Sequence, residues 1–362
     1  MTKILTIIGA RPQFIKAAVL SKAMRRPDLG IEEVIVHTGQ HWDEEMSGRF
    51  FSDLAIPRPA YQMQLHATSA LARAGEMLQG LAPILAQEQP DAVAVYGDTD
   101  STLAGAWAAA RLDVRLIHIE AGLRSGDRSM PEEINRIGTD HWATHLCCPT
   151  EAAVEQLRSE GIVDGRGGRR VAVVGDLQCA AALNAGPFDP AAPAGPVLLT
   201  MHRPANVDDP SRLLDWLDAI GKALLTRGMH SVFPIHPRTK AMCEQIWGGE
   251  WRAGLAARSI EAREPAGYHE LMQLAAAAPF VLTDSGGLQK EAYVLGTKVL
   301  VLRPVTEWKE LLSLGAARCV ARPADLAATW AELSQLKTQR EDVYGAVNAG
   351  ERLADQIAQW LS

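Results

Sequence analysis

The stretch Ala92-Val-Ala-Val-Tyr-Gly-Asp98 is followed further along the chain by Leu116-Ile-His-Ile-Glu120. Each is a short apolar run that leads into an acidic residue, which is typical of a buried parallel strand with a polar group at its carboxyl end. Ligands of open α/β sheets bind at this edge. Two carboxylates there repel each other unless a cation, a proton or a substrate offsets their charge. We therefore predict a parallel α/β fold with acid/base chemistry at Asp98 and Glu120, and Glu132 in the same region as a third acidic candidate.

The length and composition of the chain limit its class. A chain of 362 residues exceeds the size of one hydrophobic core, so two domains are expected. The net charge of -7 and the lack of a face dense in lysine and arginine predict no nucleic-acid partner. No apolar run approaches the length of a membrane span, and the N-terminus lacks the pattern of a signal peptide, so a cytoplasmic protein without a membrane partner is expected.

Apolar, β-branched runs alternate with amphipathic segments in both halves of the chain. We predict strands, by residue number, at 3–9, 33–38, 92–97, 115–120, 145–148 and 171–175, and then at 197–201, 231–235, 280–283, 299–302 and 319–321. This alternation predicts two doubly wound, Rossmann-like α/β domains that face each other across a cleft. Residues 1–185 form the first domain, which carries the acidic residues, and residues 197–342 form the second. Residues 186–196 are rich in proline and read as a linker.

Neither a metal nor a cofactor is indicated. The five cysteines form no C-x-x-C pair and are expected to be free thiols, and no His/Cys/Asp cluster has the spacing of metal ligands. The fingerprint G-x-G-x-x-G is absent, and the second strand ends in His37-Thr38-Gly39 without the acidic residue that would hold a ribose. A tightly held nicotinamide cofactor is therefore disfavoured.

The segment Val281-Leu-Thr-Asp-Ser-Gly-Gly-Leu-Gln-Lys-Glu291 has the pattern of a strand, a glycine turn and a helix. Glycines let backbone N–H groups approach an anion, and the helix N-terminus favours negative charge, so Ser285, Gly286 and Gly287 are predicted to bind phosphate. Glu291 is placed to accept a hydrogen bond from a ribose hydroxyl. The competing interpretation is that the glycines only form a tight turn.

Two further sets of residues also suggest an anionic ligand. Arg11 and Lys16 follow the first strand and its glycine, although each alone is more often a solvated surface charge. His202 and His236 follow two strands of the second half, each with an arginine nearby. Each histidine taken alone is more often a helix cap or a buried, satisfied side chain. Together with the glycine turn they favour an anion site.

Several motifs in one order resemble those of the non-hydrolysing UDP-N-acetylglucosamine 2-epimerases over nearly the whole chain. They are GARPQFIK at residues 9–16, TGQH at 38–41, YGDT at 96–99, HIEAGLRSGD at 118–127, PEEINR at 131–136, HRPAN at 202–206, HPR at 236–238 and LTDSGG at 282–287. The resemblance implies a fold like that of the B-type glycosyltransferases, a UDP-sugar as partner, a homodimer and a helix within residues 343–362 that packs back on the first domain.

The resemblance also assigns roles to individual positions. By motif, the catalytic residues would be Asp98, Glu120, Glu132 and His202. The positions that match substrate or UDP binding are Arg11, Lys16, Arg124, Arg136, His236, Ser285, Gly286, Gly287 and Glu291. No metal and no cofactor are implied.

The implied chemistry gives the carboxylates a purpose. No carbonyl group acidifies the C2–H bond of the sugar, so departure of UDP from C1 must lead. An oxocarbenium-like centre then forms, and an adjacent carboxylate stabilises it and accepts the C2 proton, which gives a 2-acetamidoglucal. Returning a proton to the opposite face needs a second acid/base group. The sequence does not say which carboxylate serves which face.

Some positions depart from the better-known bacterial members of this family. Residues 40–47 read QHWDEEMS, and Glu76 stands where those members have an arginine that helps to bind an activating second substrate molecule. We therefore expect no substrate activation of that kind. The same segment resembles relatives that act on UDP-2,3-diacetamido-2,3-dideoxyglucuronate, which is an alternative substrate. Three rival functions are those of a hydrolysing epimerase, a B-type glycosyltransferase and a non-enzymatic sugar-nucleotide binder.

Overall fold

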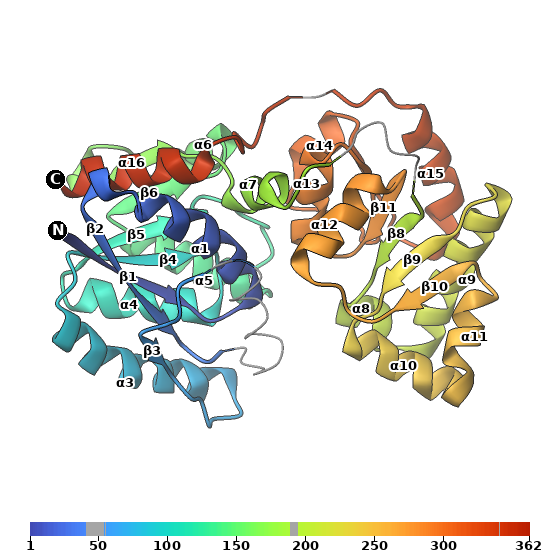
Figure 1. The fold of residues 1–362 in the computed structure, drawn as a ribbon, viewed down its shortest axis with the longest axis horizontal. Helices are drawn as coiled ribbons and strands as arrows, with labels where there is room; N and C mark the ends of the chain where they lie inside the picture. Colours follow the sequence, from blue (N-terminus) through green and yellow to red (C-terminus); the bar gives the residue numbers. More distant parts are fainter. Residues whose placement is uncertain (41–53, 55, 189–194, 340) are drawn as a thin grey trace. The chain divides into compact units, whose positions relative to one another are not determined.

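The computed structural model describes residues 1–40, 54, 56–188, 195–339 and 341–362. The chain forms two compact units. The first unit is Met1–Ala181 together with Asp342–Ser362, and the second unit is Ala182–Glu341 (Figure 1). Two predicted features lie outside the described residues: the segment 41–47, which departs from the bacterial pattern, and most of the predicted linker at 189–194.

The first unit contains a parallel sheet of seven strands in the order β3-β2-β1-β4-β5-β6-β7. Its strands are β1 (Thr2–Ile8), β2 (Ile31–His37), β3 (Tyr61–Gln62), β4 (Ala92–Tyr96), β5 (Arg115–Ile119), β6 (His145–Cys148) and β7 (Arg170–Val173). The chain winds outward from β1 in one direction and from β4 in the other. Such a switch point leaves a crevice at the carboxyl ends of the two strands, where α/β proteins bind ligands.

Helices cover both faces of this sheet (Figure 1). They are α1 (Arg11–Met24), α3 (Ala70–Glu88), α4 (Asp100–Arg111), α5 (Pro131–Trp142), α6 (Glu151–Ser159) and α16 (Ala349–Leu361). Helix α7 (Leu177–Asn184) begins in the first unit and ends in the second. The C-terminal helix α16 buries Leu353, Ala354 and Ile357 and packs against α1. Gly350 allows this close packing, because a Cβ there would lie 2.7 Å from Cγ1 of Val19. The last helix of the chain therefore belongs to the first unit.

The second unit repeats the design with six parallel strands in the order β10-β9-β8-β11-β12-β13. Its switch point lies between β8 and β11. The strands are β8 (Val197–Thr200), β9 (Ser231–Pro234), β10 (Ile260–Arg263), β11 (Phe280–Thr283), β12 (Lys298–Val301) and β13 (Ala317–Cys319). The helices are α8 (Pro204–Val207), α9 (Pro210–Thr226), α10 (Pro237–Trp247), α11 (Trp251–Ala256), α12 (Tyr268–Ala277), α13 (Gly286–Val294), α14 (Lys309–Ser313) and α15 (Leu326–Gln335). The predicted class, two doubly wound α/β sheets, is confirmed.

Two strands were not predicted, and β2 (predicted as 33–38) and β13 each begin two residues earlier than predicted. The edge strands β3 and β10 were not predicted, because Tyr61–Gln62 is only two residues long and Ile260–Arg263 has exposed charged residues at every second position. The last strand, β13, begins two residues before the predicted 319–321. The five cysteines are free, as predicted. Among the described residues, no helix is long and apolar enough to cross a membrane.

Candidate active site

The carboxyl ends of β4 and β5 hold the first two predicted acidic residues. The two strands pair in parallel with Tyr96 opposite Ile119, so Asp98 and Glu120 leave the same edge of the sheet. Glu120 has a φ of 71°, in the left-handed region that side chains other than glycine rarely adopt. Its backbone N–H donates to Cys147 O at 3.0 Å, which holds this conformation. Strain of this kind, about 1–2 kcal/mol, is concentrated at functional sites.

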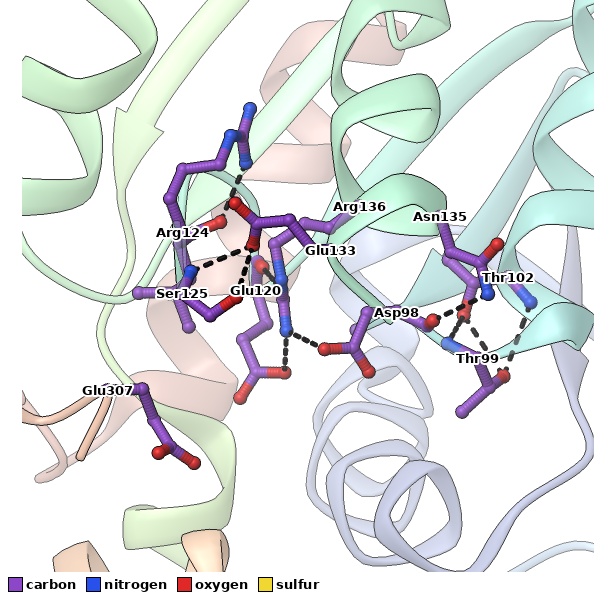
Figure 2. Close-up of polar contacts among 12 residues, drawn as sticks. Asp98, Thr99, Thr102, Glu120, Arg124, Ser125, Glu133, Asn135, Arg136 and Glu307 are labelled. Carbon is purple, nitrogen blue, oxygen red and sulfur yellow. Dashed lines mark hydrogen bonds and ion pairs between the residues drawn. The ribbon is translucent and has the colours of Figure 1, made fainter. Parts of the chain in front are cut away.

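Arg136, on α5, joins the two carboxylates (Figure 2). Its Nη2 lies 2.6 Å from Oδ2 of Asp98 and 3.6 Å from Oε2 of Glu120, and its Nη1 donates to the backbone carbonyl of Glu120. Lys16, on α1, is ion-paired with the same Glu120 oxygen. Both cations are buried, with 7% and 5% of their surfaces exposed. Burial alone would lower the pKa of Arg136, but the charges of Asp98, Glu120 and Asp140 outweigh it and raise that pKa.

These contacts fix the charge of the site. Two cations, Lys16 and Arg136, face two carboxylates, so both acids can remain ionised side by side. Ionised carboxylates at this position can accept a proton from a substrate and can stabilise a cationic centre. The structure thus brings together four of the predicted residues. In it, Lys16 and Arg136 are ion-paired with the two acidic side chains.

The third predicted acid, Glu132, takes part in none of the ion pairs described among these residues. It is exposed in the first turn of α5, one helical turn before Arg136 on the same side of the helix. Among the described residues, the contacts that link Arg136, Asp98 and Glu120 do not include it. Its neighbour Glu133 is buried instead and accepts hydrogen bonds from the backbone N–H groups of Ser125 and Gly126 at 2.8 and 3.0 Å. The adjacent pair of glutamates in the sequence did not show which one faces inward.

Two other predicted positions of the first unit have different surroundings. Arg124 donates to Oδ2 of Asp140 at 2.6 Å and makes two hydrogen bonds of 2.8 Å with Glu160. Its guanidinium is therefore hydrogen-bonded to two carboxylates of the protein. Arg11 is exposed at the start of α1. Glu76 accepts hydrogen bonds from the backbone N–H groups of His66 and Ala67.

Gln13 was not predicted as a site residue, although it lies within the motif GARPQ. Its Oε1 accepts from the N–H groups of Gly9 and Ala10 at 2.7 and 3.0 Å, and its Nε2 donates to Tyr96 O at 2.9 Å. It is 1% exposed. Gln13 therefore ties the turn after β1 to the end of β4 across the switch point. In the sequence, its position between Arg11 and Lys16 was the available signal.

A small pocket opens beside Glu120 at the carboxyl edge of the same sheet. It is lined by Lys16, Ile119, Glu120, Pro149, Gly175, Asp176 and Leu177. Asp176 caps the start of α7, because its Oδ1 accepts from the N–H groups of Gln178 and Cys179 at 2.9 Å each. The pocket thus combines apolar walls with one cation and two carboxylates.

In the second unit, Asp284 organises the predicted His202 motif. This fully buried carboxylate follows β11 and accepts from the backbone N–H groups of His202 at 3.1 Å and Arg203 at 2.9 Å. It also accepts from Nδ2 of Asn206 at 3.1 Å, and Nδ1 of His202 lies 3.3 Å away. The turn after β8 is therefore fixed across the second switch point. Asp284 lies within the motif LTDSGG but was not predicted to have this role.

His202 and His236 lie side by side, with ring centroids 5.5 Å apart. The side chain of His202 is 39% exposed, so its ring is open to a ligand. His236 is the N-cap of α10, and its Nδ1 accepts from the backbone N–H of Arg238 at 3.2 Å. The sequence allowed His236 to be a helix cap, and the structure shows that it is one.

The glycine turn begins α13. Ser285 is the N-cap residue, and a Cβ at Gly286 would lie 2.4 Å from Oε1 of Glu307, so a larger residue there would require the Glu307 side chain to move. Nε1 of Trp308 donates to Gly286 O at 2.9 Å and thereby holds the turn. Glu291 is 3% exposed and accepts a hydrogen bond of 3.0 Å from the hydroxyl of Tyr268.

Lys290 adds a buried positive charge beneath this turn. Its Nζ lies 4.2 Å from the centroid of the Trp308 ring, and the residue is 1% exposed. Arg303 is ion-paired with Glu307 at 3.0 Å. The helix N-terminus, Lys290 and Arg303 add positive charge at this end of the second sheet, beside the carboxylates of Asp284, Glu291 and Glu307. Within the described part of the chain, no group of three or more His, Cys, Asp or Glu side chains could hold a metal ion.

Comparison with known proteins identifies the family. The family model described as UDP-N-acetylglucosamine 2-epimerase matches residues 22–358. The chain belongs to the UDP-N-acetylglucosamine 2-epimerase family. It is therefore an isomerase, and the resemblance drawn from the sequence motifs is confirmed. The order of the motifs carried that inference, since each motif alone is short.

Individual relatives cover almost the whole chain. It is 42% identical over 364 residues to the UDP-2,3-diacetamido-2,3-dideoxy-D-glucuronate 2-epimerase of Pseudomonas aeruginosa, with 99% of both chains covered. It is 34% identical to the UDP-N-acetylglucosamine 2-epimerase of Methanocaldococcus jannaschii, with 97% of both covered. The crystal structure of the Methanocaldococcus jannaschii UDP-GlcNAc 2-epimerase with UDP-GlcNAc and UDP matches with a TM-score of 0.85 at 33% identity, over 99% of both chains.

A more distant neighbour shares only the fold. The calicheamicin glycosyltransferase CalG4 matches with a TM-score of 0.58 at 15% identity, over 100% of this chain and 98% of that one. The predicted likeness to a glycosyltransferase fold is confirmed by this match. Because many chemistries use one fold, the activity must be argued from the site.

Proposed function

We propose that this enzyme is a non-hydrolysing 2-epimerase, which inverts C2 of a UDP-linked 2-acetamido sugar by eliminating UDP and adding it back. The observation that carries the proposal is the pair of carboxylates, Asp98 and Glu120, held by the buried Arg136 and Lys16. This arrangement supplies two proton carriers and a place for a cationic centre. The family membership supplies the sugar nucleotide.

The proposed reaction begins at C1. The C1–O bond breaks and its electron pair leaves with the β-phosphate of UDP, so positive charge develops on C1 and the ring oxygen. One carboxylate of the pair then takes the C2 proton, and the electrons of the C2–H bond form the C1–C2 double bond of a 2-acetamidoglucal. A proton is returned to C2 from the opposite face, and UDP adds again to C1. No cofactor is needed, because no electrons are gained or lost overall.

The second unit would bind the nucleotide. The turn of Ser285, Gly286 and Gly287 at the start of α13 offers backbone N–H groups to a phosphate. His202 follows the adjacent strand β8, and its side chain is partly exposed. Glu291 is a buried acceptor for a sugar hydroxyl. Binding the remote nucleotide would help to hold the sugar in its reacting geometry.

UDP-N-acetylglucosamine, interconverted with UDP-N-acetylmannosamine, is the first candidate substrate, because the family description and most of the relatives name it. UDP-2,3-diacetamido-2,3-dideoxyglucuronate is the second. It is favoured by a specific observation: the relative named for this substrate is 42% identical over 99% of both chains, against 34% for the Methanocaldococcus jannaschii enzyme. Either product would be an activated sugar suited to the synthesis of cell-surface polysaccharide.

We also propose that the enzyme works as a homodimer in the cytoplasm. Trp107 on α4 and Ile134 and Trp142 on α5 are 44%, 49% and 40% exposed. The two helices pack together, and Leu103 lies against Gly138 between them, so these side chains form one apolar stripe. Exposed stripes of large apolar residues mark protein interfaces. Five free cysteines are typical of a reducing compartment.

Hydrogen exchange at C2 tests the proposed reaction. The protein is incubated with each candidate UDP-sugar in deuterated water, and C2 is followed by NMR. Deuterium at C2 together with the C2 epimer supports the proposal, and the relative rates choose between the substrates. Stoichiometric release of free UDP and the N-acetylmannosamine-type sugar would instead indicate a hydrolysing enzyme. No exchange with either compound would refute epimerisation.

A further inference from the structure

A buried histidine lies directly behind the two carboxylates. His118, in the middle of β5, is fully buried, and both ring nitrogens have partners. Nε2 lies 2.7 Å from the carbonyl oxygen of Gly97, the residue before Asp98. Nδ1 lies 2.6 Å from Oδ1 of Asp140, on α5. The ring therefore spans from the turn that carries Asp98 to the helix that carries Arg136.

The two partners determine how this ring is protonated. A backbone carbonyl can only accept, so Nε2 carries a hydrogen. Asp140 accepts through its other oxygen from Arg124 at 2.6 Å and from the N–H of Gly122 at 3.1 Å, which are contacts of an ionised carboxylate. Nδ1 must therefore donate as well, and the ring is an imidazolium.

The surrounding charges agree with this assignment. Four carboxylates lie in the connected set, and three of its cations are permanently charged at neutral pH. The carboxylates are Asp98, Glu120, Asp140 and Glu160, and the three cations are Lys16, Arg124 and Arg136. Apart from His141, which lies 3.5 Å from Glu160 and whose side chain is 45% exposed, a doubly protonated His118 makes the set neutral, whereas a neutral ring would leave a negative charge in a largely buried region, which is costly.

The turn after β4 needs such support. Gly97 has a φ of 65°, its N–H donates to Ile119 O at 2.9 Å, and its own carbonyl is held by His118. The orientation of that peptide decides where the next side chain, Asp98, leaves the backbone. Because the N–H and the carbonyl of Gly97 are both held from β5, the strand that leads to Glu120 also sets the position of Asp98.

We propose that His118 is a positioning residue for the epimerase reaction. As an imidazolium, it donates to Gly97 O and to Asp140, and thereby holds the Gly97–Asp98 turn in place. The proposal rests on the proposed function. It assigns His118 no contact with the substrate. It explains why a histidine, which can donate in two directions at once, occupies a strand position where an apolar residue would pack as well.

The variant His118→Gln tests this role. The glutamine amide can donate to Gly97 O, but its oxygen would face the Asp140 carboxylate, so the turn should shift. We expect C2 exchange at saturating substrate to fall about 100-fold, as for an ångström-scale displacement of a catalytic group, while UDP affinity stays within twofold of wild type. His145→Gln is the matched control, because His145 is a buried histidine on the adjacent strand β6 and should leave both unchanged. Exchange within threefold of wild type in His118→Gln, or an equal loss of UDP affinity, would overturn the proposal.

A measurement on the wild-type enzyme does not depend on the folding of a variant. With ¹⁵N-labelled histidine, the ring of His118 at pH 7.5 should give imidazolium-type signals with a proton on each nitrogen. A neutral ring in an enzyme that exchanges C2 hydrogen would refute the positioning role and leave the proposed function intact. An enzyme that exchanges no C2 hydrogen would refute the function, and the positioning role with it, whatever the signal of His118.

Discussion

The substitution Asp98→Asn separates proton transfer from binding at the site. Oδ2 of Asp98 accepts from Nη2 of Arg136 at 2.6 Å, and an asparagine oxygen can occupy the same place, so the turn should keep its geometry. The side chain is 31% exposed, so the loss of its charge should cost only about 1 kcal/mol of stability. Loss of a positioned general base lowers turnover about 10²- to 10⁴-fold, or about 3–5 kcal/mol of activation free energy.

C2 exchange in deuterated water measures turnover for this variant, and calorimetric titration with UDP measures binding. UDP affinity should remain near that of wild type while exchange collapses. Asp100→Asn is the control: this neighbouring carboxylate accepts from Nδ2 of Asn135 at 3.0 Å and is not assigned to the reaction. Wild-type exchange in Asp98→Asn, or a parallel loss of exchange and UDP affinity, would show that Asp98 does not carry the proton.

Three further predictions concern Arg136, the glycine turn and pH. In Arg136→Lys, one ammonium cannot bind both Asp98 and the carbonyl of Glu120, so we expect urea denaturation to show about 2–3 kcal/mol less stability; an unchanged midpoint would contradict this. Trp308→Phe removes the hydrogen bond to Gly286 O, so calorimetry should show UDP affinity about fivefold weaker, and equal affinity would argue against a phosphate site at this turn. Burial lowers the pKa of His145 in the folded protein to about 4. Between pH 6.5 and 4 this imidazole therefore binds a proton in the unfolded state but not in the folded state. The free energy of unfolding should therefore fall by up to about 3 kcal/mol as the pH is lowered through that window. In His145→Gln this fall should be smaller, and an equally steep fall in the variant would refute the role of His145.

The sheet architecture could be predicted because central strands of a parallel sheet are buried on both faces. The run 92–97 is apolar throughout and is followed by Asp98, and the run 115–120 is apolar at Leu116, Ile117 and Ile119 and ends in Glu120. Edge strands lack this signal, so β3 and β10 were missed. The order of the strands, with its two switch points, follows from pairing between distant segments and has no local signature.

The site could be predicted in part. Asp98 and Glu120 are detectable because they follow strands, and the structure places them together with Arg136 and Lys16. The roles of the two cations were not detectable, since the sequence does not show that each one contacts a carboxylate rather than solvent or ligand.

The supporting residues were harder to find. Gln13, Asp284 and Glu133 form hydrogen bonds to backbone N–H groups, and those bonds exist only once distant turns come together. In the sequence each is an ordinary polar residue beside a motif. The helical phase that exposes Glu132 and buries Glu133 depends on where α5 begins, and boundaries of helices are the least predictable feature of a fold.

Cleavage of the C1–O bond is the central claim, and positional isotope exchange tests it most directly. The UDP-sugar is prepared with ¹⁸O in the bridge between C1 and the β-phosphate, incubated with the enzyme and analysed by ³¹P NMR. If UDP leaves and returns, the label must scramble between bridging and non-bridging positions of the β-phosphate while the C2 epimer accumulates. Epimerisation at C2 with the label retained in the bridge would contradict the account.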